Sequence, residues 1–241
     1  MGLATLGYAF ACSIVGAVIQ AVCGFGYGAI SMTVMPYLWA YQQAVATSSL
    51  CGCSTATIIA VTNFRYINWK MLIPCAVTGT ITAAAAIRFS LGAARGVMMH
   101  SLGVILIAMG LYQLFFNGKI TIKPTIRNGI IAGFCSGALS GLFAMSGPPA
   151  AVYMIAAAQT NDEYRATLNA QFSITALASA VARFVNGIIG KEVLIAVAVM
   201  LPAIAIGSVI GSRVFHRLDA KRLRQLVNAY LIISGIMMLV K

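Results

Sequence analysis

The feature that most constrains this chain is a series of long apolar runs that contain almost no charged residues. The runs cover residues 3–22, 43–63, 69–87, 97–116, 126–145, 166–182, 193–212 and 226–240. Most approach the ~20 residues that an α-helix needs to cross a bilayer. A soluble helical bundle would need polar outer faces, which these runs lack. The sequence therefore predicts an all-α polytopic membrane protein surrounded by the lipid bilayer.

Charge and cysteine content argue against several other classes of protein. Only 8% of the residues are charged, against about a quarter in a soluble domain. The net charge of +12 comes from basic residues that lie mainly between the apolar runs, so we expect no nucleic-acid binding. Six cysteines and two histidines lack the spacing of a metal site, and we expect neither a metal nor another cofactor. The first residues show no cleavable signal peptide, so structure is expected from residue 3 onward.

The two halves of the chain repeat the same order of features at an offset of 120 residues. Placing residues 26–64 over residues 146–184 aligns a glycine-rich break with a proline-rich one. Each half then contains a helix, a break, a short helix and three long helices. This pattern predicts a first repeat over residues 1–120 and a second over residues 121–241, joined in one integral membrane domain.

The distribution of basic residues predicts how the repeats face the membrane. If the halves are inverted, most of the sixteen lysines and arginines fall on one side of the bilayer, as cytoplasmic loops require, whereas parallel halves divide them evenly. Inversion requires each half to cross an odd number of times, so residues 27–37 and 147–158 are expected to form half-helices. The sequence thus predicts a multi-pass inner-membrane protein with both termini outside the cytoplasm. It does not define the oligomeric state, and a homodimer is one arrangement that it allows.

The two breaks are the candidate binding site. A break in the middle of a membrane helix is tolerated only inside protein or beside a water-filled cavity. The N-terminus of each following half-helix would point its positive dipole end into the break, which favours an anion. The residues proposed to line this site are Gly24, Gly26, Tyr27 and Gly28 of the first break and Ser146, Gly147 and Pro148 of the second. The alternative is that these glycines and prolines serve only close helix packing.

Polar residues on the helix after each break could complete the site. They are Thr47 and Ser48 in the first half and Thr167, Asn169 and Gln171 in the second. Hydroxyl and amide groups can donate to oxyanions without the cost of burying a charge, but each of these groups could equally bridge two helices. Arg183, late in its run, is the weaker candidate for attracting an anion.

The positions of the four acidic residues exclude other functions. Asp162, Glu163, Glu192 and Asp219 all lie near predicted helix ends, so no carboxylate is expected in mid-membrane, where proton or sodium relays usually carry one. This argues against a cation channel and favours a facilitator, or a carrier whose substrate brings its own proton. No nucleophile, base and acid occur near one another in the sequence, so neither catalytic residues nor an enzyme is expected.

The segment SGLFAMSGPPAAVYMIAAAQTNDEYRATLNAQFSI, with Gly141 to Pro149 followed by Arg165-Ala166-Thr167, resembles the second repeat of the TauE/SafE sulfite-exporter family. The glycine-rich first break resembles the first repeat more loosely. The resemblance implies a multi-span carrier that moves sulfite or organosulfur anions such as sulfoacetate, mostly outward, with some relatives handling thiosulfate inward. Ser146 stands where the family often has another glycine, and Phe25 and Tyr27 separate the glycines of the first break.

These observations together predict a secondary transporter of a small sulfur oxyanion or sulfonate, with export as the favoured direction. Two alternatives stay open. One is a carrier of a small carboxylate on the same fold. The other is a membrane thiol-redox or sulfur-relay protein that uses its cysteines.

Overall fold

The computed structural model describes residues 2–115, 122–214 and 220–240, and every regular element in them is helical. A short helix follows each of the two breaks, as expected. In chain order the elements are α1 (Leu3–Cys23), α2 (Tyr27–Leu38), α3 (Tyr41–Thr62), η1 (Phe64–Tyr66), α4 (Trp69–Leu91), α5 (Arg95–Phe115), α6 (Ile126–Phe143), α7 (Gly147–Ala157), α8 (Asn161–Val185), α9 (Lys191–Val214) and α10 (Ala220–Val240). The predicted all-α fold is confirmed.

Most of the helices are suited to a bilayer. Among the described residues, α1, α3, α4, α5, α6 and α9 are long and apolar enough to cross a membrane, and α10 contributes a shorter apolar stretch. On α4, Ile73, Val77 and Ile81 recur every fourth residue and are each more than half exposed. A continuous apolar stripe of this kind faces lipid rather than water. The chain is a multi-pass membrane protein, as predicted.

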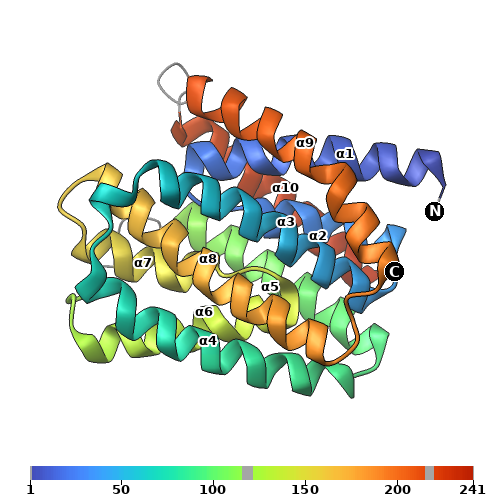
Figure 1. Cartoon of the computed structure of the whole chain (residues 1–241), viewed down its shortest axis with the longest axis horizontal. Helices are drawn as coiled ribbons and strands as arrows, with labels where there is room; N and C mark the ends of the chain where they lie inside the picture. The colour runs from blue at the N-terminus through green and yellow to red at the C-terminus, as the bar shows by residue number, and fades with distance from the viewer. Residues whose placement is uncertain (1, 116–121, 215–219, 241) are drawn as a thin grey trace.

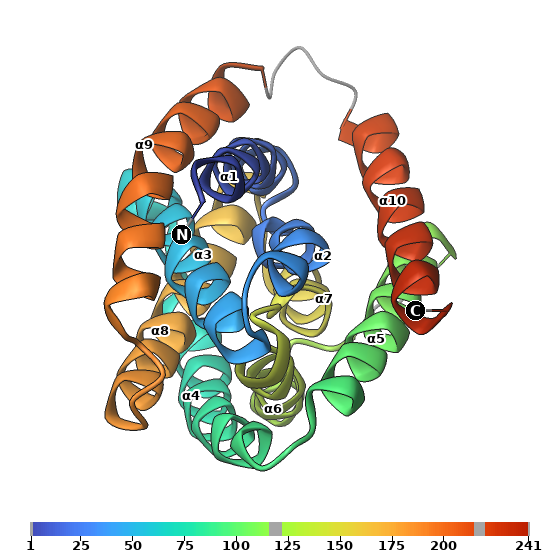
Figure 2. The same cartoon turned by 90° about the vertical axis from the view of Figure 1, so that its right-hand side faces the viewer.

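The two halves of the chain make matching contacts. Helix α3 lies against α8 and α5 against α10, while α4 packs on α6 in the way that α9 packs on α1. If α1–α5 are matched in order with α6–α10, each of these helix contacts in one half has its counterpart in the other. Helices α3 and α8 run in opposite directions (Figure 1). The contacts agree: Ser49, early in α3, approaches Arg183, late in α8, whereas Thr57, later in α3, bonds to Ser173, earlier in α8. In Figure 2 the α5–α10 pair stands at one side of the other helices.

A glycine stripe on α6 allows the closest of these helix contacts. Gly133, Gly137 and Gly141 form this stripe and face the backbone of α4. A β-carbon at Gly141 would lie 2.6 Å from the carbonyl oxygen of Ala83. Small residues let membrane helices approach in this way. The stripe therefore lets α6 pack closely against α4.

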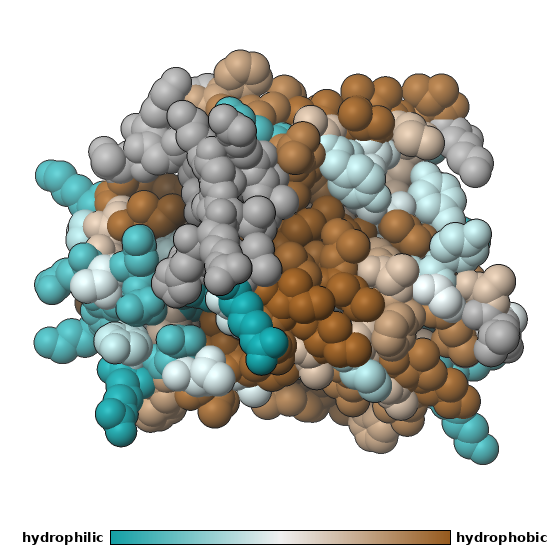
Figure 3. Space-filling model, turned by 90° about the horizontal axis from the view of Figure 1, so that it is seen from above, coloured by the Kyte–Doolittle hydropathy of each residue, from teal (hydrophilic) through white to brown (hydrophobic). Residues whose placement is uncertain are grey.

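The ends of the bundle differ in character. The α3–α4 loop, the start of α6 and the α7–α8 loop lie together at the left end of Figure 1, and both termini lie at the right end. On the face shown in Figure 3, hydrophilic residues gather at the left end and apolar residues cover the middle. The sequence also predicts that both termini lie on one side of the membrane. Which side that is stays a prediction.

Candidate functional site

The first break is a short left-handed turn between α1 and α2. Gly24 ends α1 with a φ of 84° and Gly26 precedes α2 with a φ of 125°. Residues with a β-carbon rarely adopt these angles, so glycine is required here. The first hydrogen bond of α2 runs from the N–H of Ile30 to the carbonyl of Gly26. The N–H groups of Tyr27, Gly28 and Ala29 therefore have no helical acceptor.

The second break has the same form with different residues. Ala144, 120 positions after Gly24, ends α6 with a φ of 55° and is the one non-glycine residue with positive φ in the described chain. Ser146 precedes α7, which begins Gly147-Pro148-Pro149. Since neither proline has an N–H, α7 offers a single free donor in its first three residues, that of Gly147.

Ser146 occupies the N-cap position of α7 but makes no capping hydrogen bond. An N-cap side chain accepts from the N–H of the second or third helical residue. Here those residues are Pro148 and Pro149, which have none. The Ser146 hydroxyl has no hydrogen-bond partner among the described residues, and it is thus available to a ligand.

The two breaks meet in the middle of the protein and border a small cavity. A β-carbon at Gly28 would overlap the carbonyl oxygen of Ala144 and lie 3.0 Å from its carbonyl carbon, so backbone packs directly on backbone. The cavity beside this contact measures about 50 Å³, room for roughly three or four water molecules or one small ion. Its lining residues from the breaks are Phe25, Gly26, Gly28, Ala144, Met145, Ser146 and Gly147.

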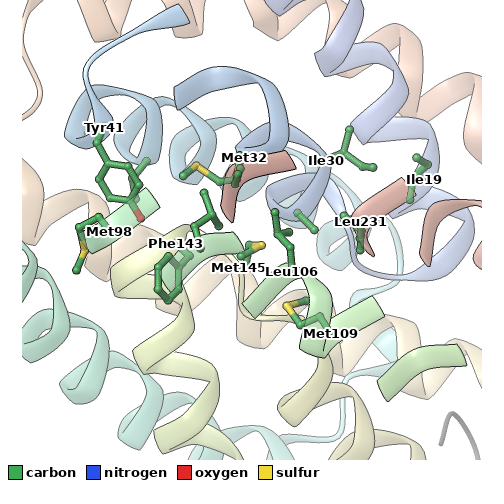
Figure 4. Packing of buried hydrophobic residues seen from close by; sticks show 14 of the residues in the cluster. Ile19, Ile30, Met32, Tyr41, Met98, Leu106, Met109, Phe143, Met145 and Leu231 are labelled. Carbon is green, nitrogen blue, oxygen red and sulfur yellow. The ribbon is translucent and has the colours of Figure 1, made fainter. Parts of the chain in front are cut away.

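Residues from five long helices complete the cavity wall. Gln20 of α1 and Ser140 of α6, which correspond at the 120-residue offset, both line it, as does Ser49 of α3. Apolar contributions come from Met109 of α5 and from α8. Met109 and Met145 belong to a methionine-rich layer that separates the α5–α10 pair from the breaks (Figure 4). Methionine side chains adapt readily to changing neighbours, so this wall is the most deformable part of the site.

Helix α8 supports both breaks through hydrogen bonds. Asn169 donates to the carbonyl of Gly24 (3.1 Å) and accepts from Gln20 (3.1 Å). Gln171 donates to the Ser136 hydroxyl (3.4 Å), which in turn donates to the carbonyl of Ser146 (2.8 Å). Carbonyls released by the breaks are thereby satisfied without water, as a membrane interior requires.

A second cavity, of about 570 Å³, lies among α1, α3, α8 and α9. Its wall includes Asn63, Arg165 and Ser212. Asn169 also donates to the carbonyl of Arg165 (2.9 Å), so its bond to Gln20 joins the walls of the two cavities. Ala21 and Arg165, which neighbour this amide pair, belong to the wall of the larger cavity, which we call the vestibule.

The predicted site residues fall into three groups in the structure. Four line the cavity: Gly26, Gly28, Ser146 and Gly147. Three belong to the breaks or hold them by hydrogen bonds without lining the cavity: Gly24, Asn169 and Gln171. The other five, Tyr27, Thr47, Ser48, Pro148 and Thr167, lie outside the small cavity's lining.

Several of the outlying residues have structural partners instead. The Tyr27 hydroxyl bonds to Ser13 (2.9 Å), and the Ser48 hydroxyl bonds to Ser31 of α2 (2.6 Å). The Thr167 hydroxyl accepts from the backbone N–H of Asn68 at the start of α4 (2.9 Å). These bonds join neighbouring helices, the alternative role that the sequence left open.

The sequence prediction missed Gln20, Ser49 and Ser140. Serines are too frequent in this chain for type alone to single out two of them. The repeat offset of 120 would have identified Gln20 and Ser140 as a corresponding pair on the helix before each break, since both stand four residues ahead of the left-handed turn.

The polar groups in the cavity lining are of kinds that can donate hydrogen bonds to an anion. These groups are hydroxyls, an amide and the N-terminal ends of two helices, and no carboxylate lines the cavity. Within the described residues, no cluster of histidine, cysteine and acidic side chains could hold a metal ion.

A multi-pass helical protein with a small cavity between two broken helices has the architecture of known membrane transporters. The chain matches the family model described as sulfite exporter TauE/SafE over residues 8–238, and it belongs to that family. It is therefore a transporter and not an enzyme. It is similar to the probable sulfite/organosulfonate exporter TauE of Cupriavidus necator, with 22% identity over 203 residues that cover 82% of this chain and 79% of the relative. No solved structure matches the chain significantly.

Proposed function

We propose that this protein carries a small sulfur oxyanion or organosulfonate across the inner membrane and binds it in the cavity between the two breaks. The observation that carries the proposal is that one cavity is lined by the N-cap residues of both half-helices, Gly26 and Ser146. Two positive dipole ends then act on the same bound ion.

The donors around the cavity suit a sulfur oxyanion. Sulfite presents only acceptor oxygens, and the site offers backbone N–H groups of α2 together with the hydroxyls of Ser140 and Ser146. Neither hydroxyl has a hydrogen-bond partner among the described residues. A substrate larger than sulfite, such as a sulfonate, would need extra room, which the methionine-rich layer could provide by rearranging.

Export is the proposed direction, and it depends on the orientation of the protein. We propose that the two halves are inverted repeats and that the end carrying the α3–α4 and α7–α8 loops is cytoplasmic, since basic residues gather in the loops there. The vestibule would then open to the cytoplasm and the termini would lie outside. The similar protein of Cupriavidus necator is named as a probable exporter, which supports this direction.

Ligand binding to purified protein tests the substrate class. We expect sulfite, sulfoacetate or thiosulfate to raise the melting temperature of the detergent-solubilised protein, because a ligand that binds only the folded form stabilises it by mass action. Acetate, succinate and sulfate serve as comparison anions. A shift produced by the carboxylates alone would instead favour a carboxylate carrier on the same fold.

Site variants test the location. Ser146→Ala and Gly26→Leu should lower uptake into inside-out vesicles, while Ser54→Ala, whose hydroxyl bonds only its own helix at Leu50, should not. Parental transport rates in folded Ser146→Ala and Gly26→Leu proteins would contradict the assignment. A variant without Cys23, Cys51, Cys53 and Cys135 should still transport, whereas a thiol-relay protein would lose its activity.

A further inference from the structure

Arg183, near the end of α8, is buried without an acidic partner. Only 1% of its surface is exposed. One guanidinium nitrogen donates to the carbonyl of Gly141 (2.7 Å) and another lies 3.5 Å from the hydroxyl oxygen of Ser49. The third nitrogen, Nε, is buried and has no hydrogen-bond partner in the described part of the chain.

None of the chain's four acids neutralises this charge within the described residues. Asp162 and Glu163 stand at the opposite end of α8, some 20 residues and about 30 Å away along the helix. Glu192 is exposed and accepts from Gln43 (2.9 Å). Asp219 lies outside the described residues. A cation held inside a membrane protein without a counter-ion is costly, and such residues are characteristic of ion pathways.

Ser49 connects this charge to the cavity. Its side chain lines the cavity, and its oxygen accepts from Arg183. A hydroxyl that accepts one hydrogen bond still has its own O–H to donate. The Ser49 O–H can therefore point at an anion in the cavity while the guanidinium behind it polarises the bond.

We propose that Arg183 is the counter-charge of the transported anion and acts on it through Ser49. The inference rests on the proposed function and adds a requirement to it. The bound substrate must carry a net negative charge, because it supplies the counter-ion that Arg183 does not find among the described residues. A zwitterion such as taurine, with no net charge, would bind more weakly than sulfoacetate.

Binding measurements on the full-length protein in detergent test this role. We expect Arg183→Gln to weaken sulfoacetate binding by about tenfold or more, the usual loss for a hydrogen bond to a charged group. Arg183→Lys, which keeps the charge, should recover part of the affinity. Ser49→Ala should also weaken binding, although it leaves the bond between Arg183 and Gly141 in place. Arg95→Gln is the matched control, since Arg95 also donates to a backbone carbonyl, that of Pro36 (2.9 Å), but away from the cavity.

The outcomes separate this inference from the proposed function. If the parent binds sulfur anions and folded Arg183→Gln binds them equally well, the counter-charge role is wrong and Arg183 only joins α8 to α6. If Arg183→Gln does not fold, unchanged binding by Ser49→Ala overturns the inference in its place. If the parent binds no anion from the panel, the proposed function itself fails. A preference for sulfoacetate over taurine that disappears in Arg183→Gln supports the inference.

Discussion

Replacing Gly28 by alanine should force the two breaks apart. The new β-carbon would overlap the carbonyl oxygen of Ala144 and lie 3.0 Å from its carbonyl carbon, where ordinary contact begins at 3.4 Å. The two backbones must therefore separate by more than 0.4 Å, because the oxygen is closer still. Neither side of this contact is a flexible side chain that could rotate away.

The expected cost follows from that geometry. Overpacking a tight interior costs about 1–3 kcal/mol, and here the upper end applies because backbone must move. Alanine regains about 1 kcal/mol of helix propensity, which leaves a net loss of about 2 kcal/mol. For a chain of this length that corresponds to a fall in melting temperature of about 4–8 °C.

Thermal unfolding in detergent, followed by a sulfite titration, measures both effects. Gly7→Ala is the control, since Gly7 also lies inside a helix but a β-carbon there meets nothing within 4 Å. We expect Gly28→Ala to melt lower and to lose the sulfite-induced shift, and Gly7→Ala to match or exceed the parent. Equal behaviour of the two variants would refute the direct contact between the breaks.

Other substitutions near the breaks have defined outcomes. Gly24→Ala should destabilise the protein by about 1–2 kcal/mol because alanine disfavours its φ of 84°, whereas Ala144→Gly should raise the melting temperature by relieving the same conformation. A shift of the same sign in both variants would contradict this. Ser136→Ala should cost about 1–3 kcal/mol, since the buried carbonyl of Ser146 loses its donor; a circular-dichroism melt identical to that of the parent would disprove it. Gly137→Ala should separate α6 from α4 and lower the melting temperature, and an unchanged value would show that the helices pack less closely.

The sequence predicted the elements better than their partners. Apolar runs located the long helices to within a few residues, and both half-helices begin where the breaks predicted, at Tyr27 and Gly147. Two helices begin well before their apolar runs: α10 starts at Ala220 rather than at residue 226, and α8 starts at Asn161 rather than at residue 166. Its polar first turn is helical because the Thr160 hydroxyl accepts from the N–H of Glu163 (3.1 Å).

The direction of individual side chains could not be read from the sequence. Tyr27 follows Gly26 directly, yet it packs away from the cavity because successive side chains on a helix diverge by about 100°. Arg183 was ranked low because it lies late in its helix, but a long side chain on α8 reaches back toward the preceding turn and so toward Ser49. Such contacts depend on how α3, α6 and α8 assemble, and no local pattern encodes that.

The polar face of α8 has a consequence for how the protein enters the membrane. Thr167, Gln171, Thr175, Ser179 and Arg183 recur every fourth residue and are almost completely buried, and α8 is absent from the helices apolar enough to cross alone. A segment with this much polarity is inserted unfavourably by the translocation machinery. We expect α8 to enter only alongside α3 and α4, which precede it in the chain and cover its polar face. Membrane insertion of α8, the helix that supports the transport site, would then depend on α3 and α4 being already in place.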